Sequence, residues 1–459
     1  MTTIPNSPHA RDIAALLHPQ TNTGEHEQVG PLILDEGKGI YVKDLEGKEY
    51  LEGMAGLWCT SLGFSNERLV DAAIAQMRKL PTYHTFFGRS NMAAIELAEK
   101  LLSIAPVPMS KVWFANSGSE ANDHMVKFVW YYNNACGRPE KKKILGRLEG
   151  FHGTAVSSGS LTGLTRTHKD FDLPIARFLH TGSHHYYGHA RNGESEEAFA
   201  TRRAEELEQL ILDEGPETIA AFVAEPVMGA GGAIPPPATY WEKIQAVLRR
   251  HDVLMVADEI ITGFHRTGNT FACQTYGIEP DIMVVAKQLS SAYMPISAVM
   301  LNEKIYGPIR DQATENANFS TGFTYQGHPV AAAVALETLK IYDDLNIGEH
   351  VRAVSKVAQA RLSALRDHPI VGDANGVGLI GAVELTRDKA TKENFGPEIA
   401  TWCEQACQNH GVILRTCSGK RLAFCPPLII EADEVEVLFD RMEKGLDDTY
   451  EHVKSAGLL

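Results

Sequence analysis

Long apolar runs, a secretory signal and paired cysteines are all missing from this chain of 459 residues. No stretch approaches the roughly 20 apolar residues that span a bilayer, and the first twenty residues lack the apolar core of a secretory signal. The seven cysteines are scattered and form no CxxC pair. Because a reducing compartment suits such cysteines, we expect a cytoplasmic protein with buried free thiols at Cys403 and Cys407, and no membrane partner.

Basic residues are also in short supply. The chain has 43 lysines and arginines against 58 acidic residues, which gives a net charge of −15. Nucleic acids and anionic membranes attract proteins of the opposite charge, so neither is expected as a partner. The length allows two or three domains, and small molecules are the partners that the composition favours.

The chain does contain three short apolar runs, and each of them stops at a single charged residue. They are Ile219–Ala224 before Glu225, Val253–Ala257 before Asp258, and Ile282–Ala286 before Lys287. Unbroken apolar runs of this length are typical of strands buried on both faces. In open α/β sheets ligands bind at the carboxyl ends of such strands, so the three charged groups predict a binding site.

An acid and a lysine at one sheet edge suit pyridoxal phosphate (PLP). The lysine forms a Schiff base with this cofactor, and the acid faces its protonated ring nitrogen. A strand, a Gly-Ser turn and a helix at KVWFANSGSEANDHMVKF add a phosphate cradle, with Asn116, Ser117, Gly118 and Ser119 at the helix start. The competing interpretation is a buried salt bridge between Asp258 and Lys287.

Several separated motifs then match one family in order. The stretches NSGSEAN, ADEIITGFHRTG and PDIMVVAKQLSSAY resemble those of the class III (omega) aminotransferases of PLP fold type I, in particular the amine:pyruvate omega-transaminases. The resemblance implies an α/β fold, in which a large domain with a mostly parallel sheet covered by helices joins a smaller α+β domain built from both termini. We expect an arm and part of the small domain in 1–58, the PLP domain in 59–330, and the rest of the small domain in 331–459.

The resemblance also implies roles for the cofactor residues. Lys287 would hold PLP and then shuttle the substrate proton, while Asp258 would keep the ring nitrogen protonated. Phe151 stands where the family usually has tyrosine and would stack on the ring, with Ile260 on the opposite face. The remaining cofactor residues that it implies are Ser117, Gly118, Ser119, His152, Glu225, Phe323 and Thr324. His152 is alternatively a satisfied core histidine.

The substrate residues follow from the same resemblance. Leu57, Trp58, Phe86, Phe87, Phe151 and Ala230 would line the pocket, and Arg415 would bind a substrate carboxylate. Arg421 is the competing arginine, because either side chain can form a bidentate pair with a carboxylate. Trp58 is equally consistent with a core tryptophan.

The segment Gly322–Tyr325 precedes a long predicted helix. In the family its threonine, here Thr324, reaches the cofactor phosphate of a neighbouring subunit, which predicts a homodimer or tetramer with a shared site. Thr321 stands where the family usually has histidine, so the shape of this loop is open. The alternative is that Thr324 caps the helix.

Three histidines, His184, His185 and His189, crowd a polar loop, and we interpret them as solvated rather than as metal ligands. The glycines of Gly376–Gly381 fall late and lack a following helix, which argues against a nicotinamide-dependent dehydrogenase. We therefore expect an enzyme that moves an amino group from a primary amine or ω-amino acid to a keto acid such as pyruvate in a ping-pong cycle. Another class III PLP enzyme, an aminomutase, racemase or decarboxylase, is the alternative.

Overall fold

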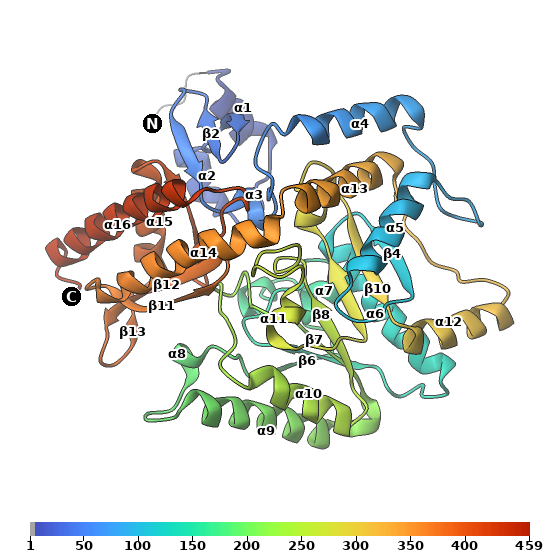
Figure 1. The fold of residues 1–459 in the computed structure, drawn as a ribbon. Coiled ribbons are helices and arrows are strands. Elements are labelled where there is room, and N and C mark those ends of the chain that lie inside the picture. The colour runs from blue at the N-terminus through green and yellow to red at the C-terminus, as the bar shows by residue number, and fades with distance from the viewer. Residues whose placement is uncertain (1–4) are drawn as a thin grey trace.

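A seven-stranded sheet forms the centre of the larger part of the molecule (Figure 1). The computed structural model describes residues 5–459. The strands follow the spatial order β4 (Lys111–Ala115), β10 (Ser297–Leu301), β9 (Ile282–Val285), β8 (Leu254–Asp258), β7 (Ile219–Ala224), β5 (Lys143–Arg147) and β6 (Phe178–Thr181). Only β10 runs antiparallel to its neighbours; the other pairings are parallel. The mostly parallel sheet is thus confirmed.

Both faces of this sheet are buried, because alternate side chains of each strand enter different apolar clusters. Phe222 of β7 packs with one cluster and Val223 with the other. The covering helices explain the long apolar runs of these strands. The helices are α5 (Met92–Ile104), α9 (Glu196–Glu214), α10 (Tyr240–Arg250) and α13 (Pro329–Asp344) for the first cluster, and α6 (Gly118–Ala135), α7 (Val156–Leu161) and α12 (Glu303–Glu315) for the second.

Strands from both ends of the chain meet in two smaller sheets. One has the order β1 (Leu34–Lys38), β2 (Tyr41–Asp44), β3 (Glu49–Glu52), β14 (Val412–Ile413), and β14 pairs parallel with β3. The other has the order β11 (Val371–Val377), β12 (Ile380–Asp388), β16 (Arg421–Phe424), β15 (Arg415–Cys417), with β13 (Glu393–Asn394) on β12. The pairing of β3 with β14 joins the two chain ends in one smaller unit, as the resemblance implied.

The helices of this smaller unit are α14 (Ile347–Ala364), α15 (Pro397–Asn409) and α16 (Ala432–Ser455). The glycines at 376–381 fall in the hairpin between β11 and β12, so no helix follows them. A dinucleotide-binding fingerprint is followed directly by a helix, so these glycines do not support the nicotinamide-dependent dehydrogenase. Cys403 and Cys407 are buried free thiols, as predicted.

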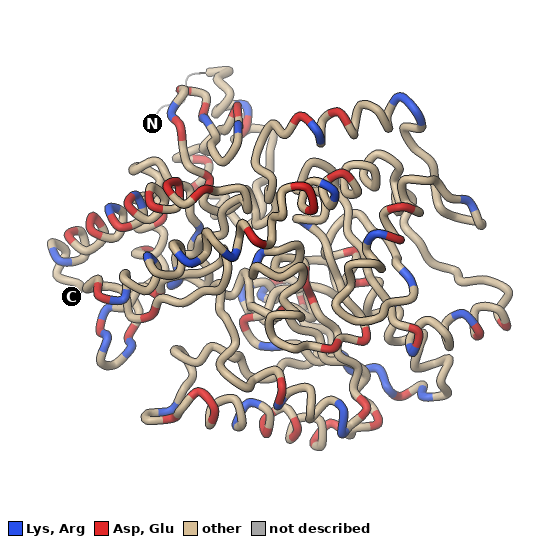
Figure 2. Tube along the Cα trace, viewed as in Figure 1, with Lys and Arg blue, Asp and Glu red and all other residues tan. Residues whose placement is uncertain are grey.

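The remaining elements are short or lie at the surface: α1 (Pro8–Ala15), α2 (Thr23–Val29), α3 (Ala55–Trp58), α4 (Glu67–Lys79), α8 (Tyr186–His189) and α11 (Ala272–Tyr276). Asn66 caps α4 by accepting a hydrogen bond from the Leu69 amide, as the sequence predicted. Charged side chains follow the outer helices α9 and α16 (Figure 2). No helix within residues 5–459 is both long and apolar enough to cross a membrane.

Candidate active site

Lys287 and Asp258 line one cavity at the carboxyl ends of β9 and β8. The cavity measures about 140 Å³ and lies between the sheet edge and the start of α6. Its walls are formed by Ser117, Gly118, Ser119, Phe151, His152, Gly153, Glu225, Asp258, Ile260, Ile261 and Lys287. Nine of the predicted cofactor residues therefore lie together around one space, although they come from five separate stretches of chain.

The backbone at Lys287 is strained. Its φ angle is +48°, a left-handed conformation that costs non-glycine residues roughly 1–3 kcal/mol. The side chain borders the cavity, and burial lowers the pKa of its amine. The nearby Asp258 and Glu225 carboxyls act in the opposite direction and are smaller influences. A lysine whose amine gives up its proton more readily is a better nucleophile and base.

Asp258 is held by three donors. His152 Nδ1 lies 2.7 Å and Asn122 Nδ2 lies 3.0 Å from Oδ2, while the Ile260 amide lies 3.1 Å from Oδ1. A carboxylate can only accept, so His152 must carry its proton on Nδ1. Among the described residues no ion pair joins Asp258 to Lys287, which removes the salt-bridge interpretation.

His152 is not a satisfied core histidine. Its Nε2 atom is buried and has no hydrogen-bond partner within residues 5–459. A buried polar atom without a partner costs about 1–3 kcal/mol, which a bound group can recover. The Nδ1 atom of the ring is therefore bound to Asp258, whereas the Nε2 atom is available to a ligand.

Glu225 lies on the opposite wall. It accepts hydrogen bonds from the amides of Phe151, at 3.2 Å, and Gly229, at 2.9 Å. Burial raises the pKa of this carboxyl, and the Asp258 charge acts in the same direction. Glu225 thus ties the loop that carries Phe151 to the Gly-rich turn after β7, where Ala230 is buried but does not line the cavity.

The start of α6 has the properties of an anion cradle. Gly118 and Ser119 are its first two residues, so their amides have no acceptor within the helix. A β-carbon at Gly118 would lie 2.8 Å from Ile260 Cδ1, so only glycine leaves this approach open. Free amides and the helix dipole favour a phosphate here. The cradle, the unpartnered His152 nitrogen and the lysine fit PLP.

Four of the other predicted substrate residues lie outside this cavity. Trp58 is 1% exposed and packs with Met54 and Ile261, so it supports the cavity wall from behind instead of lining it. Leu57 is 57% exposed and Phe87 is 85% exposed. Phe86 packs against Gly322 in a separate hollow. Their substrate roles stay predictions, because a single chain does not bring them to Lys287.

The loop that contains Phe323 and Thr324 is also separate from the cavity. Phe323 packs on His124, and Thr324 is exposed. The helix-cap alternative for Thr324 is wrong, because α13 begins at Pro329 with His328 as its N-cap. Thr321 Oγ1 lies 2.9 Å from His124 Nε2 and accepts a hydrogen bond from Lys127, and these contacts define the loop shape that the sequence left open.

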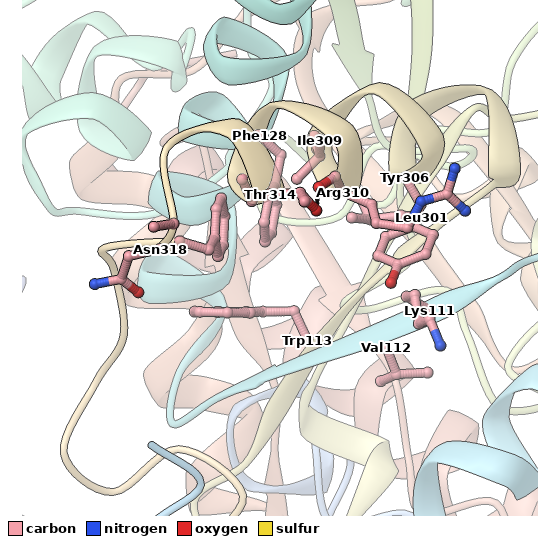
Figure 3. A pocket seen from close by; sticks show the side chains of 13 residues that line it. Lys111, Val112, Trp113, Phe128, Leu301, Tyr306, Ile309, Arg310, Thr314 and Asn318 are labelled. Carbon is pink, nitrogen blue, oxygen red and sulfur yellow. Dashed lines mark hydrogen bonds between the residues drawn. The ribbon is translucent and has the colours of Figure 1, made fainter. Parts of the chain in front are cut away.

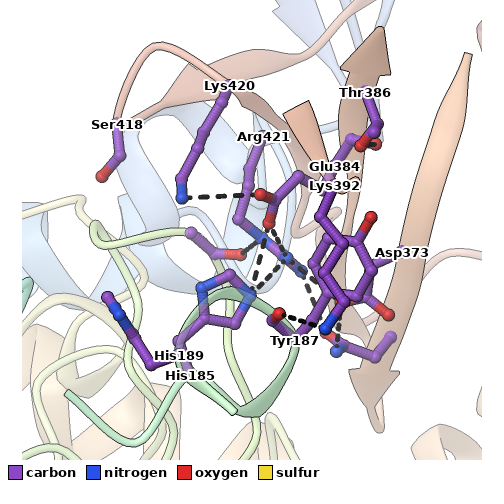
Figure 4. Close-up of polar contacts among 12 residues, drawn as sticks. His185, Tyr187, His189, Asp373, Glu384, Thr386, Lys392, Ser418, Lys420 and Arg421 are labelled. Atoms are coloured by element: carbon purple, nitrogen blue, oxygen red, sulfur yellow. Dashed lines mark hydrogen bonds and ion pairs between the residues drawn. The ribbon is translucent and has the colours of Figure 1, made fainter. Parts of the chain in front are cut away.

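Arg421 is excluded as the substrate arginine. Figure 4 shows its guanidinium surrounded by polar groups, and it donates to Glu384 at 2.9 Å, to Asn375 at 2.9 Å and to the Gly232 carbonyl at 2.8 Å. The side chain is completely buried. Arg415 is half-buried, and no carboxylate forms an ion pair with it in the described chain.

The prediction of solvated loop histidines was wrong for two of the three. His184 and His185 are buried, and only His189 is exposed. His184 Nδ1 lies 2.7 Å from Arg147, and His185 Nε2 lies 3.1 Å from Arg421. The polar sequence around them predicted exposure to solvent, whereas both rings are buried against arginines from distant segments.

Two further residues were missed by sequence reasoning. Asn122 ends the NSGSEAN motif and faces inward one helical turn after Gly118, so helical spacing could have linked it to Asp258. Glu52 is buried and accepts from the amides of Met54 and Gly56, which holds the left-handed turn before Trp58. No sequence signal marks Glu52, because its burial depends on tertiary packing.

Comparison with known proteins identifies the class that this site defines. The family model "Aminotransferase class-III" matches residues 23–446. The chain therefore belongs to the class III aminotransferases, PLP-dependent enzymes of fold type I, and PLP is its cofactor.

Individual relatives carry more specific names. An omega transaminase from Pseudomonas jessenii in complex with PMP has 52% sequence identity and a TM-score of 0.96, covering 98% of this chain and 99% of that one. Gamma aminobutyrate transaminase 3 of Solanum lycopersicum is 47% identical over 99% of this chain and 88% of its own length. Vanillin aminotransferase of Capsicum annuum is 46% identical over 94% of both. The relatives agree on amino transfer and differ in the substrate that their names give.

Proposed function

We propose that this enzyme transfers an amino group from a primary amine or an ω-amino acid to a keto acid such as pyruvate in a ping-pong cycle. The observation that carries the proposal is the difference between its two candidate arginines. Arg421 is saturated by protein acceptors, whereas Arg415 has no ion-pair partner among residues 5–459. A half-buried guanidinium without a protein carboxylate is available for a substrate carboxylate.

The position of Arg415 supports this use. It lies on β15 opposite Ala423 of β16, and Ala423 packs in the same apolar cluster as Trp58 and Ile261. Ile261 also lines the cavity of Lys287. The arginine is thus connected to the cavity through one layer of apolar side chains, which suits a substrate with a carboxylate at one end.

The residues of the cavity divide the chemistry between them. PLP, when bound, supplies an electron-withdrawing ring that stabilises negative charge on the substrate carbon. Lys287 would hold the cofactor, and its amine, once released, would remove and return the substrate proton. Asp258, fixed by His152 and Asn122, would face the ring nitrogen and favour its protonated form. The amides of Gly118 and Ser119 would hold the phosphate end.

The amine donor follows from two features. Phe151 and Ile260 make the cavity walls apolar, and the relatives include enzymes named for γ-aminobutyrate and for vanillin. An apolar wall accepts an aromatic amine, while Arg415 accepts an ω-amino acid. We propose that both classes are donors and that the arginine is used only by those with a carboxylate.

We further propose a homodimer with shared active sites. Phe87 and Tyr325 are 85% and 66% exposed, and Thr324, which precedes Tyr325 in sequence, is exposed as well. A hollow of about 630 Å³ between β4 and α12 adds apolar surface from Trp113, Phe128, Ile309 and Phe319 (Figure 3). Exposed apolar surface of this kind marks an interface. The seven free cysteines support a reducing compartment, such as the cytoplasm.

The experiment is a pair of half-reactions monitored by visible absorbance. The yellow band of the holoenzyme should disappear with 1-phenylethylamine, disappear with γ-aminobutyrate, and return with pyruvate. A band that responds to neither amine would contradict the proposed donors and redirect the search to mutase, racemase or decarboxylase substrates. Absence of a band after PLP is added would contradict the assignment of Lys287.

Arg415→Leu tests the carboxylate assignment separately. A charged hydrogen bond contributes roughly 1.5–3 kcal/mol, so KM for γ-aminobutyrate and pyruvate should rise about 10- to 100-fold. The half-reaction with 1-phenylethylamine should not change. Arg78→Leu, an exposed arginine of α4, is the matched control and should alter neither. Equal effects on both amines would show that Arg415 supports the fold instead of the substrate.

A further inference from the structure

Two histidines and one aspartate converge at the N-terminal end of the molecule, far in sequence from every cavity residue. Asp12 lies on α1, His26 lies on α2, and His18 lies in the connection between them. His18 Nε2 is 2.9 Å and His26 Nε2 is 3.0 Å from the same Asp12 oxygen. The three side chains leave one ligand atom each within 4.8 Å of the others.

We infer that Asp12, His18 and His26 form a binding site for a divalent transition-metal ion, with Zn²⁺ as the ion that the donors suit. Zinc binds imidazole nitrogen and carboxylate oxygen at about 2.0–2.2 Å, so neighbouring ligands of a tetrahedral ion are about 3.3 Å apart. The two nitrogen–oxygen separations are within a few tenths of an ångström of that spacing. Calcium and magnesium prefer oxygen ligands alone, so the two imidazoles argue against them.

The surroundings suit a cation with an open fourth position. A hollow of about 240 Å³ borders His18 and His26 and also contains Glu27. Asp12 forms no ion pair with lysine or arginine in the described residues. The three side chains are between 11% and 27% exposed, so solvent water can supply a fourth ligand without the site being fully open.

The protons also balance. Without metal, both rings donate from Nε2 to Asp12, because a carboxylate only accepts. Binding through Nε2 requires each neutral ring to carry its proton on Nδ1 instead, which is a change of tautomer with no net proton transfer. Both rings are partly exposed, so water can accept the new Nδ1–H bond.

Metal binding would join two helices that otherwise have little to hold them. Neither α1 nor α2 contains a buried residue. A metal ion that links residues 12 and 26 acts as a cross-link, and its binding free energy adds to the stability of the arm. The site is therefore a structural staple whose effect should be confined to the N-terminal arm.

A second cluster of metal-ligating side chains is less suitable. Glu149, His185 and His189 also approach one another, but Figure 4 shows Arg421 and Lys420 beside them. Arg421 lies 3.1 Å from His185 Nε2. A positive side chain at this distance disfavours a further cation, so we expect one metal ion per chain and not two.

The test is equilibrium dialysis of the PLP-loaded enzyme against a small excess of Zn²⁺, with bound metal measured by mass spectrometry. Wild type should bind one Zn²⁺ per chain, and the double variant Asp12→Asn/His26→Gln should bind none. His9→Gln, which removes another α1 histidine outside the cluster, is the control and should keep the metal. Equal zinc in the double variant, or equal loss in His9→Gln, would overturn the proposal.

Limited proteolysis gives an independent readout. Arg11 precedes Asp12 on α1, so zinc should slow tryptic cleavage after Arg11 in wild type and leave the rate in the double variant unchanged. The same slowing in both proteins would contradict the staple. None of these residues lines the Lys287 cavity, so aminotransferase turnover should be equal in all variants, and the result does not depend on the proposed function.

Discussion

The cavity around Lys287 and the face that carries Phe87 and Thr324 differ in how completely one chain builds them. Around the cavity, Asp258 and Glu225 each receive two or more hydrogen bonds from their own chain. On the other face, Phe87 and Tyr325 are exposed, and Phe87 borders a hollow that Trp113 and Phe319 also line. One chain therefore assembles the catalytic groups, whereas two of the residues expected to enclose substrate, Leu57 and Phe87, lie exposed at its surface.

The largest effect should come from Lys287→Ala. Loss of the covalent holder and of the proton carrier should lower kcat by more than about 10³-fold, because positioned acid–base catalysis alone contributes roughly 10²–10⁴-fold. The cofactor should still bind through the α6 cradle, as measured by PLP content after gel filtration. A variant that keeps turnover would contradict the role of this cavity.

Asp258→Asn should have the next largest effect. The amide keeps the shape of the side chain but removes the charge opposite the ring nitrogen, so kcat should fall about 10²–10³-fold, as when a single electrostatic group is lost. His152→Gln is the companion variant and should have a smaller effect, because Asn122 and the Ile260 amide still hold Asp258. Equal losses would mean that orientation matters more than charge.

Phe87→Asp tests the exposed face. The side chain is 85% exposed, so the single chain should fold normally, and a charge in a buried interface should shift the protein towards monomer in light scattering. PLP retention should fall about 10-fold if a neighbouring Thr324 holds the phosphate, as one lost hydrogen bond contributes roughly 1.4 kcal/mol. Leu212→Asp on the outer helix α9 is the control. An unchanged molecular mass would contradict the assignment of this face as a subunit interface.

The smallest effect concerns Glu52. Burial raises the pKa of this carboxyl to about 7, while its hydrogen bonds from Met54 and Gly56 act in the opposite direction. Because the folded pKa is raised, protonation of Glu52 stabilises the fold. This contribution is fully present at pH values below the unfolded pKa of about 4.5, and it is lost as the pH rises through 7. Wild type should therefore lose about 3 kcal/mol relative to Glu52→Gln between these pH values, since one unit of pKa corresponds to about 1.4 kcal/mol. Urea unfolding at several pH values would measure it, and parallel pH curves would contradict it.

Much of the cavity could be predicted because its groups follow local patterns. Asp258 and Lys287 each end a buried strand, and parallel pairing of β8 with β9 places both at one edge. To predict that Asn122 contacts Asp258, the spacing of residues along a helix is needed in addition. Local patterns could not tell which of Arg415 and Arg421 is available to substrate. Arg421 is bound by Glu384 and Asn375, which lie more than thirty residues away in sequence.

Local patterns were enough to place the strands, their charged ends and the phosphate cradle, because unbroken apolar runs and turn chemistry act over a few neighbouring residues. The separated motifs were enough to indicate the family. Tertiary packing was needed to establish which arginine has no protein carboxylate, that His184 and His185 are buried, and that Asp12, His18 and His26 converge. Those outcomes depend on which distant side chains supply hydrogen bonds and exclude water, and no local pattern carries that information.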